Sequence, residues 1–297
     1  MRGPPSQPVP PVRAALRDAG LLPPGAALAP LGGGRTNVVW RFASGEGDLV
    51  AKLYLAGPGN PLFPNDAAAE GPGRRHLRGA GLAPDRVAMR AAAGRPLLVY
   101  RHVAGPRGCT DAAQAAALLR RLHGTPAPPP ALRRAASDAP ALLAAGHAIL
   151  DLCPGRDANR LRRLAPRISA DDAAPPPACL IHGDVTPGNL VRGPDGLRLI
   201  DWQCPAIGDP VEDVALFLSP AMQTVHGGGP LPGAQRSAFL GALMSQPLAA
   251  RYRRLAPLFH WRMAAYCLWK VARGDASYRA GQEAETRALD ACVSEQH

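Results

Sequence analysis

The residues whose types and spacing suggest chemistry lie between positions 182 and 201. His182 and Asp184 stand two apart, Asn189 follows Asp184 by five positions, and Asp201 ends the apolar run 197–200. In phosphoryl transfer one carboxylate receives the proton of the acceptor hydroxyl, while an amide oxygen and a second carboxylate hold Mg²⁺ against the nucleotide phosphates. Asp184, Asn189 and Asp201 match these three requirements. The spacing therefore predicts transfer of a phosphoryl group to a hydroxyl.

Each residue of this segment suits one task. Asp184 would aim the acceptor hydroxyl and receive its proton, since a loose transition state asks little of a base. Asn189 and Asp201 offer the oxygen ligands that Mg²⁺ prefers. His182 is the second catalytic candidate, and it suits bracing the loop by hydrogen bonding better than it suits reacting. The His-x-Asp motif at 182–184 or the Asp-Trp pair at 201–202 alone would fit an ordinary turn. The prediction therefore depends on the two motifs occurring together.

A glycine-rich turn upstream supports the same chemistry. Gly32, Gly33 and Gly34 lie between two predicted strands and are followed by Thr36 and Asn37. Without side chains, such a turn lets backbone N–H groups approach phosphates closely. A glycine triplet by itself is equally typical of a hairpin turn. We expect these five residues to contact a nucleotide.

Lys52 lies in the apolar strand 50–54 and needs an anionic partner if its neighbours are buried. Nucleotide phosphates and Glu70 would supply one; a solvent-facing edge lysine is the alternative. Glu70 precedes the Gly-Pro-Gly tripeptide 71–73, where a helix would lose about 3 kcal/mol for the Pro and about 1 kcal/mol for each Gly. We therefore expect the helix to break there and the Lys52–Glu70 pair to be the weakest part of the site.

The elements that must position these residues change in character along the chain. We expect a short helix at 12–20, then short β-like runs over about 27–100 around one helical stretch near 66–78, and helical patterns dominate afterwards. We predict an α+β, bilobal fold with a small antiparallel sheet in the first lobe and a larger, mainly helical second lobe. The expected divisions are a flexible tail at 1–12, a nucleotide-binding lobe at 13–100, and a catalytic and acceptor-binding lobe at 101–297.

Taken together, these motifs resemble the aminoglycoside phosphotransferase and choline kinase family, small-molecule relatives of the protein kinases. The resemblance covers about residues 27–270 and includes Gly208-Asp209-Pro210 and Asp213 after the second metal-type Asp. A protein kinase fits less well, because Trp202 and Gln203 stand where Phe-Gly would follow that Asp, and no Ala-Pro-Glu segment occurs.

The resemblance implies a protein-kinase-like fold, ATP as donor with GTP as the alternative, and Mg²⁺. It implies Asp184 as base, Asn189 and Asp201 as metal ligands, and Lys52 with Glu70 at the phosphates. Segment 100–103 would join the lobes, so that Arg101, His102 and Val103 meet the adenine. Asp213 would be a structural carboxylate that braces the catalytic loop.

The acceptor is less clearly indicated. Trp261 and Trp269 are eight apart, which places them within about 80° on one helical face. With Trp202 they could form a cation–π cage for a choline-, ethanolamine- or thiamine-like ammonium group. The alternative is that these indoles fill the core. Carboxylates are sparse in the last third of the chain, which disfavours an aminoglycoside, while a sugar or nucleoside stays open.

A second class of function is a pseudokinase that binds nucleotide without turnover. The presence of Lys52, Asp184, Asn189 and Asp201 together favours an active enzyme.

The amino-acid composition limits the classes of partner that we expect. The chain of 297 residues is 46% apolar and carries a formal net charge of +11. Basic residues do not alternate with aromatic ones, and five Phe and five Tyr offer few rings for stacking on bases, so we expect a small-molecule acceptor and no nucleic acid. No apolar run suggests a signal peptide or membrane span, and six cysteines lack a Cys-x-x-Cys pair. We expect a cytoplasmic protein with reduced thiols and no membrane association.

Overall fold

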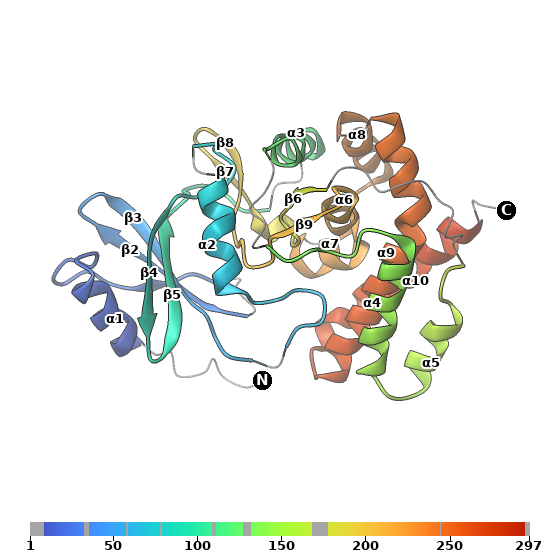
Figure 1. Cartoon of the computed structure of the whole chain (residues 1–297), viewed down its shortest axis with the longest axis horizontal. Helices are drawn as coiled ribbons and strands as arrows, with labels where there is room; N and C mark the ends of the chain where they lie inside the picture. Colours follow the sequence, from blue (N-terminus) through green and yellow to red (C-terminus); the bar gives the residue numbers. More distant parts are fainter. Residues whose placement is uncertain are drawn as a thin grey trace.

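The computed structural model describes residues 9–32, 36–57, 59–77, 79–108, 111–126, 132–167, 178–227, 229–243 and 245–294. These residues form a small lobe built on an antiparallel sheet and a larger lobe built mainly from helices (Figure 1). The predicted α+β, bilobal fold is therefore confirmed.

The sheet of the small lobe has the strand order β1-β2-β3-β5-β4, and every neighbouring pair is antiparallel. Its strands are β1 (Ala29–Pro30), β2 (Val38–Ser44), β3 (Gly47–Leu53), β4 (Arg86–Ala92) and β5 (Arg95–Arg101).

Strand β3 is buried on both faces, which explains its apolar sequence. Leu49, Ala51 and Leu53 pack in the cluster that includes the buried side of α1 (Val9–Asp18). Val50 belongs to a smaller cluster on the opposite face. Because side chains alternate along a strand, Lys52 shares the face of Val50.

Helix α1 begins at Val9, inside the segment 1–12 that was predicted to be a tail. Pro10 and Pro11 fall in its first turn, where backbone N–H groups have no helical partner and a proline loses nothing. Residues 1–8 lie outside the described residues.

The expected break after Glu70 is wrong, because helix α2 (Ala67–His76) continues through positions 71–73. Asp66 Oδ1 accepts the N–H groups of Ala68 and Ala69 at 2.8 and 3.0 Å and so caps the first turn. Glu70 is fully buried and bonded to strand β3 and to Tyr54. These contacts offset the free-energy cost of placing Gly-Pro-Gly in a helix. Helix propensity alone counts that cost and ignores the contacts. Helix α2 lies on the side of the sheet that faces the helical lobe (Figure 1).

Two short antiparallel pairs carry the motif residues of the larger lobe. Strand β6 (Cys179–Ile181) pairs with β9 (Ala206–Gly208), and β7 (Leu190–Gly193) pairs with β8 (Gly196–Leu199). The one-turn 3₁₀ helix η1 (Pro187–Asn189) leads into β7.

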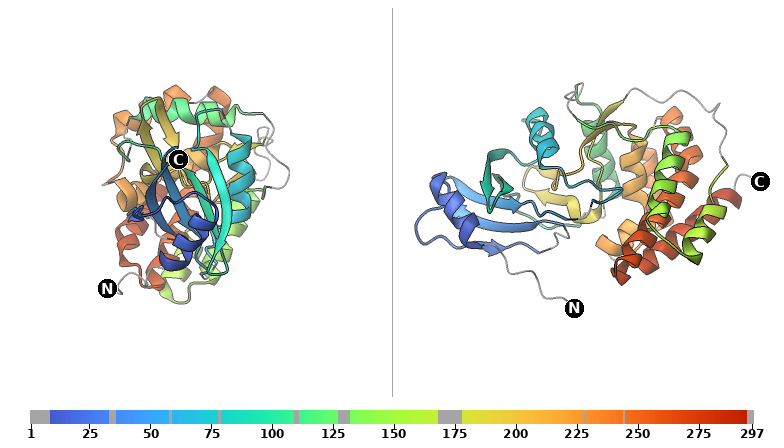
Figure 2. Two further views of the ribbon diagram at one scale, coloured as in Figure 1. Left: turned by 90° about the vertical axis from the view of Figure 1, so that its left-hand side faces the viewer. Right: turned by 60° about the horizontal axis from the view of Figure 1, so that its bottom comes forward.

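Helix α3 (Ala112–His123) packs on both pairs, and the long α9 (Gln246–Ala272) packs among the other helices on the side away from the small lobe (Figure 2). Among described residues none of the helices combines the length and apolar character needed to cross a membrane. The described cysteines are all free thiols, as predicted. The helices are α3 (Ala112–His123), α4 (Ala139–Asp151), α5 (Arg156–Arg163), α6 (Val211–Leu218), α7 (Pro220–Gly227), α8 (Gly233–Leu243), α9 (Gln246–Ala272), the 3₁₀ helix η2 (Ala276–Tyr278) and α10 (Arg279–Ser294).

A buried polar cluster joins three of these helices. Glu285 of α10 is fully buried, accepts the hydroxyl of Ser219 and the N–H of Ala221 (3.1 Å), and lies 2.6 Å from Nδ1 of His260. Burial alone would lower the pKa of His260, but hydrogen bonds to Cys292 and Glu285 raise it to about 9. His260 is therefore charged and paired at neutral pH.

We predict that Glu285→Gln lowers the free energy of unfolding by about 3 kcal/mol at pH 6, because it leaves a buried cation without its carboxylate. A folded-state pKa above the unfolded value of 6.5 gives stability that is complete below pH 6.5 and lost as the pH rises through about 9. This loss between pH 6.5 and 9 should shrink in the variant. Urea unfolding at several pH values measures both effects.

The matched control is Glu283→Gln, an exposed position on the same helix, which should change stability by less than about 0.5 kcal/mol. If Glu285→Gln behaved like this control, the buried ion pair would not stabilise the helical lobe.

Candidate active site

A cavity of about 390 Å³ lies between the two lobes. The sheet side contributes Lys52, Tyr100 and the end of the glycine-rich turn, while the helical lobe contributes the residues around η1 and parts of α7 and α9. Asp184, Asn189 and Asp201 all line this one cavity. The structure therefore brings together the three residues on which the sequence interpretation depends.

Asp184 follows β6 in a loop whose shape requires glycine at position 183. Gly183 has φ +72°, and a Cβ there would lie 2.4 Å from the backbone oxygen of Cys204. Asn189 folds back across the loop, and its Nδ2 donates to the backbone oxygen and to Oδ2 of Asp184 at 2.9 and 3.1 Å. With its NH₂ group used in this way, the amide oxygen of Asn189 is the atom suited to a cation.

His182 and Asp213 brace this loop from behind. Asp213 is fully buried and accepts the N–H groups of His182 (3.0 Å) and Gly183 (2.9 Å) as well as Nε2 of His123 (3.0 Å). Burial alone would raise the pKa of Asp213, but His123 and His182 lower it below its ordinary value. The carboxylate therefore stays ionised beneath the loop, where the resemblance had implied a bracing residue.

The ring of His182 connects the loop to the end of β8. Its Nδ1 accepts the N–H of Asp184 at 3.3 Å, so Nε2 carries the proton and donates to the backbone oxygen of Ile200 at 3.0 Å. The ring also packs edge-on against Trp202, with centroids 4.5 Å apart. Both ring nitrogens are thus engaged in holding the backbone, which favours a bracing role for His182.

Asp184 is a carboxyl group with a perturbed proton affinity. Burial and the neighbouring charge of Asp201 raise its pKa well above the ordinary value, and the opposing effects of Asn189 and Lys52 do not cancel them. A carboxylate that binds a proton more readily than usual suits a residue that must receive one.

Asp201 follows β8 and has φ +60°, the left-handed region that non-glycine residues rarely adopt. Such a conformation costs on the order of 1–3 kcal/mol and persists only where its surroundings impose it. Its Oδ1 accepts Nζ of Lys52 at 2.5 Å across the lobes. The backbone turn directs the carboxylate into the cavity.

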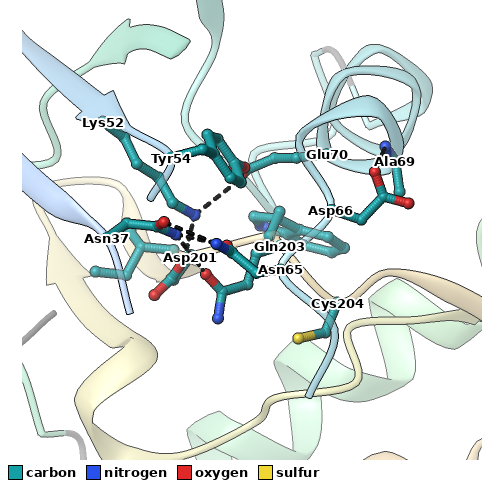
Figure 3. Close-up of polar contacts among 12 residues, drawn as sticks. Asn37, Lys52, Tyr54, Asn65, Asp66, Ala69, Glu70, Asp201, Gln203 and Cys204 are labelled. Carbon is teal, nitrogen blue, oxygen red and sulfur yellow. Dashed lines mark hydrogen bonds and ion pairs between the residues drawn. The ribbon is translucent and has the colours of Figure 1, made fainter. Parts of the chain in front are cut away.

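Lys52 is held between two carboxylates, one from each lobe. Its buried Nζ lies 2.8 Å from Oε2 of Glu70 and 2.5 Å from Oδ1 of Asp201 (Figure 3). Burial alone would lower the pKa of Lys52, but Asp201 and Glu70 raise it above its ordinary value. The hydroxyl of Tyr54 donates to the same oxygen of Glu70. The Lys52–Glu70 pair, expected to be the weakest part of the site, is therefore fully formed.

An amide cluster beside Lys52 was not predicted. Asn37 Nδ2 donates to Oδ1 of Asn65 (2.7 Å) and to Oε1 of Gln203 (2.9 Å), which links the two lobes (Figure 3). Asn37 and Gln203 both line the cavity. Sequence analysis identified Asn37 only as part of the glycine-rich turn, and a possible signal for Gln203 was its place two residues after Asp201.

Of the remaining residues predicted to contact a nucleotide, some line the cavity and others do not. Gly32 and Thr36 line the cavity, while Gly33 and Gly34 lie outside the described residues. The N–H groups of Arg101 and His102 donate to the backbone oxygens of Asp85 and Asp48, both at 2.9 Å. Among the described residues of the predicted hinge, the lining includes Tyr100 but neither these two nor Val103.

The predicted indole cage is wrong, because all three tryptophans are core residues that do not line the cavity. Trp202 packs on His182 and donates to the backbone oxygen of Leu199 (2.9 Å). Trp261 donates to the backbone of Leu161 (2.7 Å), and Trp269 stacks on Tyr266. Helical spacing placed two of them on one face of α9, but that face points into the core.

Aromatic side chains and a lysine also line the cavity. Phe63 and Tyr266 meet edge to face with centroids 5.0 Å apart, and Tyr278 lies beside them. Lys270 Nζ lies 5.0 Å from the centroid of Tyr278 and 3.2 Å from a carboxylate oxygen of Asp275. These five side chains come from three places in the chain: the segment before α2, the helix α9 and the turn around η2. No sequence motif indicates that they meet.

Asn189 and Asp201 could hold a metal ion together. Within the described residues, no cluster of three or more His, Cys, Asp or Glu side chains forms a complete metal site. Mg²⁺ is usually bound by one or two protein oxygens and completed by waters and substrate phosphates. An open site with one carboxylate and one amide oxygen fits that behaviour.

A family model described as the phosphotransferase enzyme family matches residues 27–258 of the chain. This span contains the glycine-rich turn, Lys52, Glu70 and the loop from Asp184 to Asp201. No curated protein matches the chain in sequence.

Solved structures of low sequence identity share the fold. A choline/ethanolamine kinase family protein from Mesorhizobium loti is 19% identical, with a TM-score of 0.64 over 97% of this chain and 94% of that one. The choline kinase LicA from Streptococcus pneumoniae is 18% identical, with a TM-score of 0.61 over 93% and 96%. The aminoglycoside phosphotransferase APH(3'')-Id from Streptomyces rimosus is 20% identical, with a TM-score of 0.53 over 84% and 98%.

We predict that Asp184→Asn raises the melting temperature of the ligand-free protein at pH 7. The raised pKa means that the charged carboxylate destabilises the folded state, and the amide is a neutral group of the same shape that still accepts from Asn189. A gain of about 1 kcal/mol would raise Tm by about 2–3 °C in a chain of this size. Scanning calorimetry without nucleotide or added metal measures it.

The control is Asp290→Asn, an exposed carboxylate on α10, which should leave Tm nearly unchanged. A lower Tm for Asp184→Asn would show that the folded protein stabilises the charge of Asp184, contrary to the repulsion inferred here.

Proposed function

Because the chain belongs to the phosphotransferase enzyme family, we propose that it transfers the γ-phosphoryl group of ATP, bound with Mg²⁺, to a hydroxyl of a small molecule. The observation that carries this proposal is the convergence of Asp184, Asn189, Asp201 and Lys52 on one cavity between the lobes. Protein kinases and their relatives place such groups around a nucleotide.

In the proposed reaction, the acceptor oxygen forms a bond to the γ-phosphorus while the bond to the ADP oxygen breaks. Asp184 orients the hydroxyl and receives its proton, and its raised pKa suits this task. Lys52 binds phosphate oxygens and is itself positioned by Glu70. Asn189 and Asp201 hold Mg²⁺, which neutralises charge on the phosphates.

For the acceptor we propose a small amino alcohol of the choline, ethanolamine or thiamine type. The aromatic rings of Phe63, Tyr266 and Tyr278 that line the cavity support it, since such rings attract ammonium groups. The likeness to solved choline kinases points the same way. An aminoglycoside would require a more acidic wall, whereas the carboxylates among the described lining residues, Asp184 and Asp201, belong to the catalytic end.

One observation favours a second candidate, an uncharged sugar or nucleoside. Lys270 places a cation over the ring of Tyr278, the position that an ammonium group of the acceptor would prefer. Its partner Asp275 reduces the repulsion. The positive charge of Lys270 should therefore disfavour an amino alcohol, whereas it does not repel an uncharged sugar or nucleoside.

The experiment that tests the function is a transfer assay with the purified protein, Mg·ATP and a panel of amino alcohols, sugars and nucleosides. We expect phosphorylated product from at least one acceptor, and we expect Asp184→Ala and Asp201→Ala each to lower kcat by about 10²-fold or more. Product formation that survives both substitutions would contradict the proposed roles. Nucleotide binding without any transfer across the panel would support the pseudokinase alternative.

Lys270→Met should separate the acceptor classes. Removing a like charge next to a bound ammonium group should lower the KM for an amino alcohol several-fold, because unit charges about 4 Å apart repel by about 1–4 kcal/mol near a protein surface. For an uncharged sugar or nucleoside, the same change removes a hydrogen-bond donor and should raise KM. Steady-state kinetics with both acceptor types, with kcat as the internal control, distinguish these results.

A further inference from the structure

The amide cluster of Asn37, Asn65 and Gln203 has a defined hydrogen-bond direction. The backbone N–H of Leu55 can only donate, and it lies 3.0 Å from Oδ1 of Asn37. Because this fixes which atom of Asn37 is oxygen, the other atom is its NH₂ group, 2.9 Å from Gln203. Gln203 must therefore use its oxygen as acceptor toward Asn37.

Asn65 holds Asn37 in this orientation. The two asparagines exchange reciprocal bonds of 2.7 and 2.9 Å, and Nδ2 of Asn65 also donates to the backbone oxygen of Leu55 at 3.2 Å. If the amide of Asn37 were reversed, its NH₂ group would face the N–H donor of Leu55. Its oxygen would then face the acceptor oxygen of Gln203. The cluster therefore fixes the amide plane of Gln203 from the side of the small lobe.

With its oxygen committed to Asn37, the NH₂ group of Gln203 is the part left for the cavity. Gln203 lines that cavity together with Lys52 and Asp201, and 5% of the residue is exposed. Figure 3 shows its side chain beside Asn37 and Asn65. An amide NH₂ group that faces a cavity can donate to an acceptor there, but it cannot bind a metal ion because it has no lone pair to offer. Its ligand must supply a hydrogen-bond acceptor.

We propose that Gln203 is a phosphate-binding residue of the nucleotide site, with Asn37 and Asn65 as the residues that position its amide. The proposal rests on the proposed function, since the β- and γ-phosphates of ATP would be the anionic oxygens placed near Lys52 and Asp201. Charge-assisted hydrogen bonds of this kind are stronger than neutral ones. The alternative is that Gln203 only links the two lobes.

Gln203→Glu separates these roles. The carboxylate still offers an oxygen to Asn37, so the link between the lobes is kept, but an anionic oxygen replaces the NH₂ group. We expect the affinity for Mg·AMP-PNP, measured by titration calorimetry, to fall about tenfold or more, as for the loss of one hydrogen bond to a charged group. Affinity for AMP, which lacks the β- and γ-phosphates, should change less than twofold.

Two further variants guard against a folding defect. Gln203→Met removes the NH₂ group without adding charge and should show the same selective loss to a smaller degree. Asn37→Asp should also weaken Mg·AMP-PNP binding, because its carboxylate would attract the NH₂ group of Gln203 away from the phosphates. Gln246→Glu, the same chemical change on an exposed glutamine of α9, is the control and should bind both nucleotides as the wild type does.

The outcomes are distinguishable. If the wild-type protein binds no Mg·AMP-PNP, the proposed function itself is wrong. If the wild type binds and Gln203→Glu binds equally well, the phosphate-binding role is overturned. A parallel loss of AMP and Mg·AMP-PNP affinity together with a lower melting temperature would assign Gln203 a purely structural role and would equally overturn the proposal.

Discussion

The structure depends on the neutralisation of one buried ammonium group. Lys52 sits on a strand that is buried on both faces, and an isolated charge there would cost several kcal/mol. Glu70 of α2 and Asp201 of the helical lobe supply the two counter-charges. Because this one cation bonds to both carboxylates, the sheet, α2 and the loop after β8 are joined at a single buried ion-pair cluster.

The same requirement explains why α2 survives a sequence that should break it. Glu70 stands immediately before Gly71-Pro72-Gly73, and a helix that ended there would still have to hold its carboxylate against Lys52 and Tyr54. The cost of the tripeptide is local, whereas losing Glu70 would remove the fully buried member of the two carboxylates that neutralise Lys52. The tertiary contacts of Glu70 therefore help to keep the neighbouring residues in a helical conformation.

Sequence patterns predicted what is local and missed what is assembled from distant segments. Asp184, Asn189 and Asp201 lie within 18 positions, so spacing and residue type were enough to predict their meeting. Asn37 and Gln203 are 166 positions apart, and no pattern indicates that bond. The indole cage failed for a related reason: periodicity shows that Trp261 and Trp269 share a face of α9, but this helix is buried on nearly all sides, so periodicity cannot say which face meets a cavity.

The residues in and behind the cavity consequently fall into two groups that differ in how many partners each side chain holds. At the catalytic end, Asp213, His182 and Lys52 each satisfy several partners at once, so a change in one disturbs backbone, charge and neighbouring side chains together. Among the other lining residues, Phe63 and Tyr278 are buried in a core cluster with Tyr266, whereas Lys270 is partly exposed and pairs with Asp275. A substitution of Lys270 can therefore alter the charge of the cavity while the contacts of Lys52, Asp184 and Asp213 stay in place. Under the proposed function, one chemistry can then serve different acceptors, because the charge that faces the acceptor and the contacts that join the lobes come from different residues.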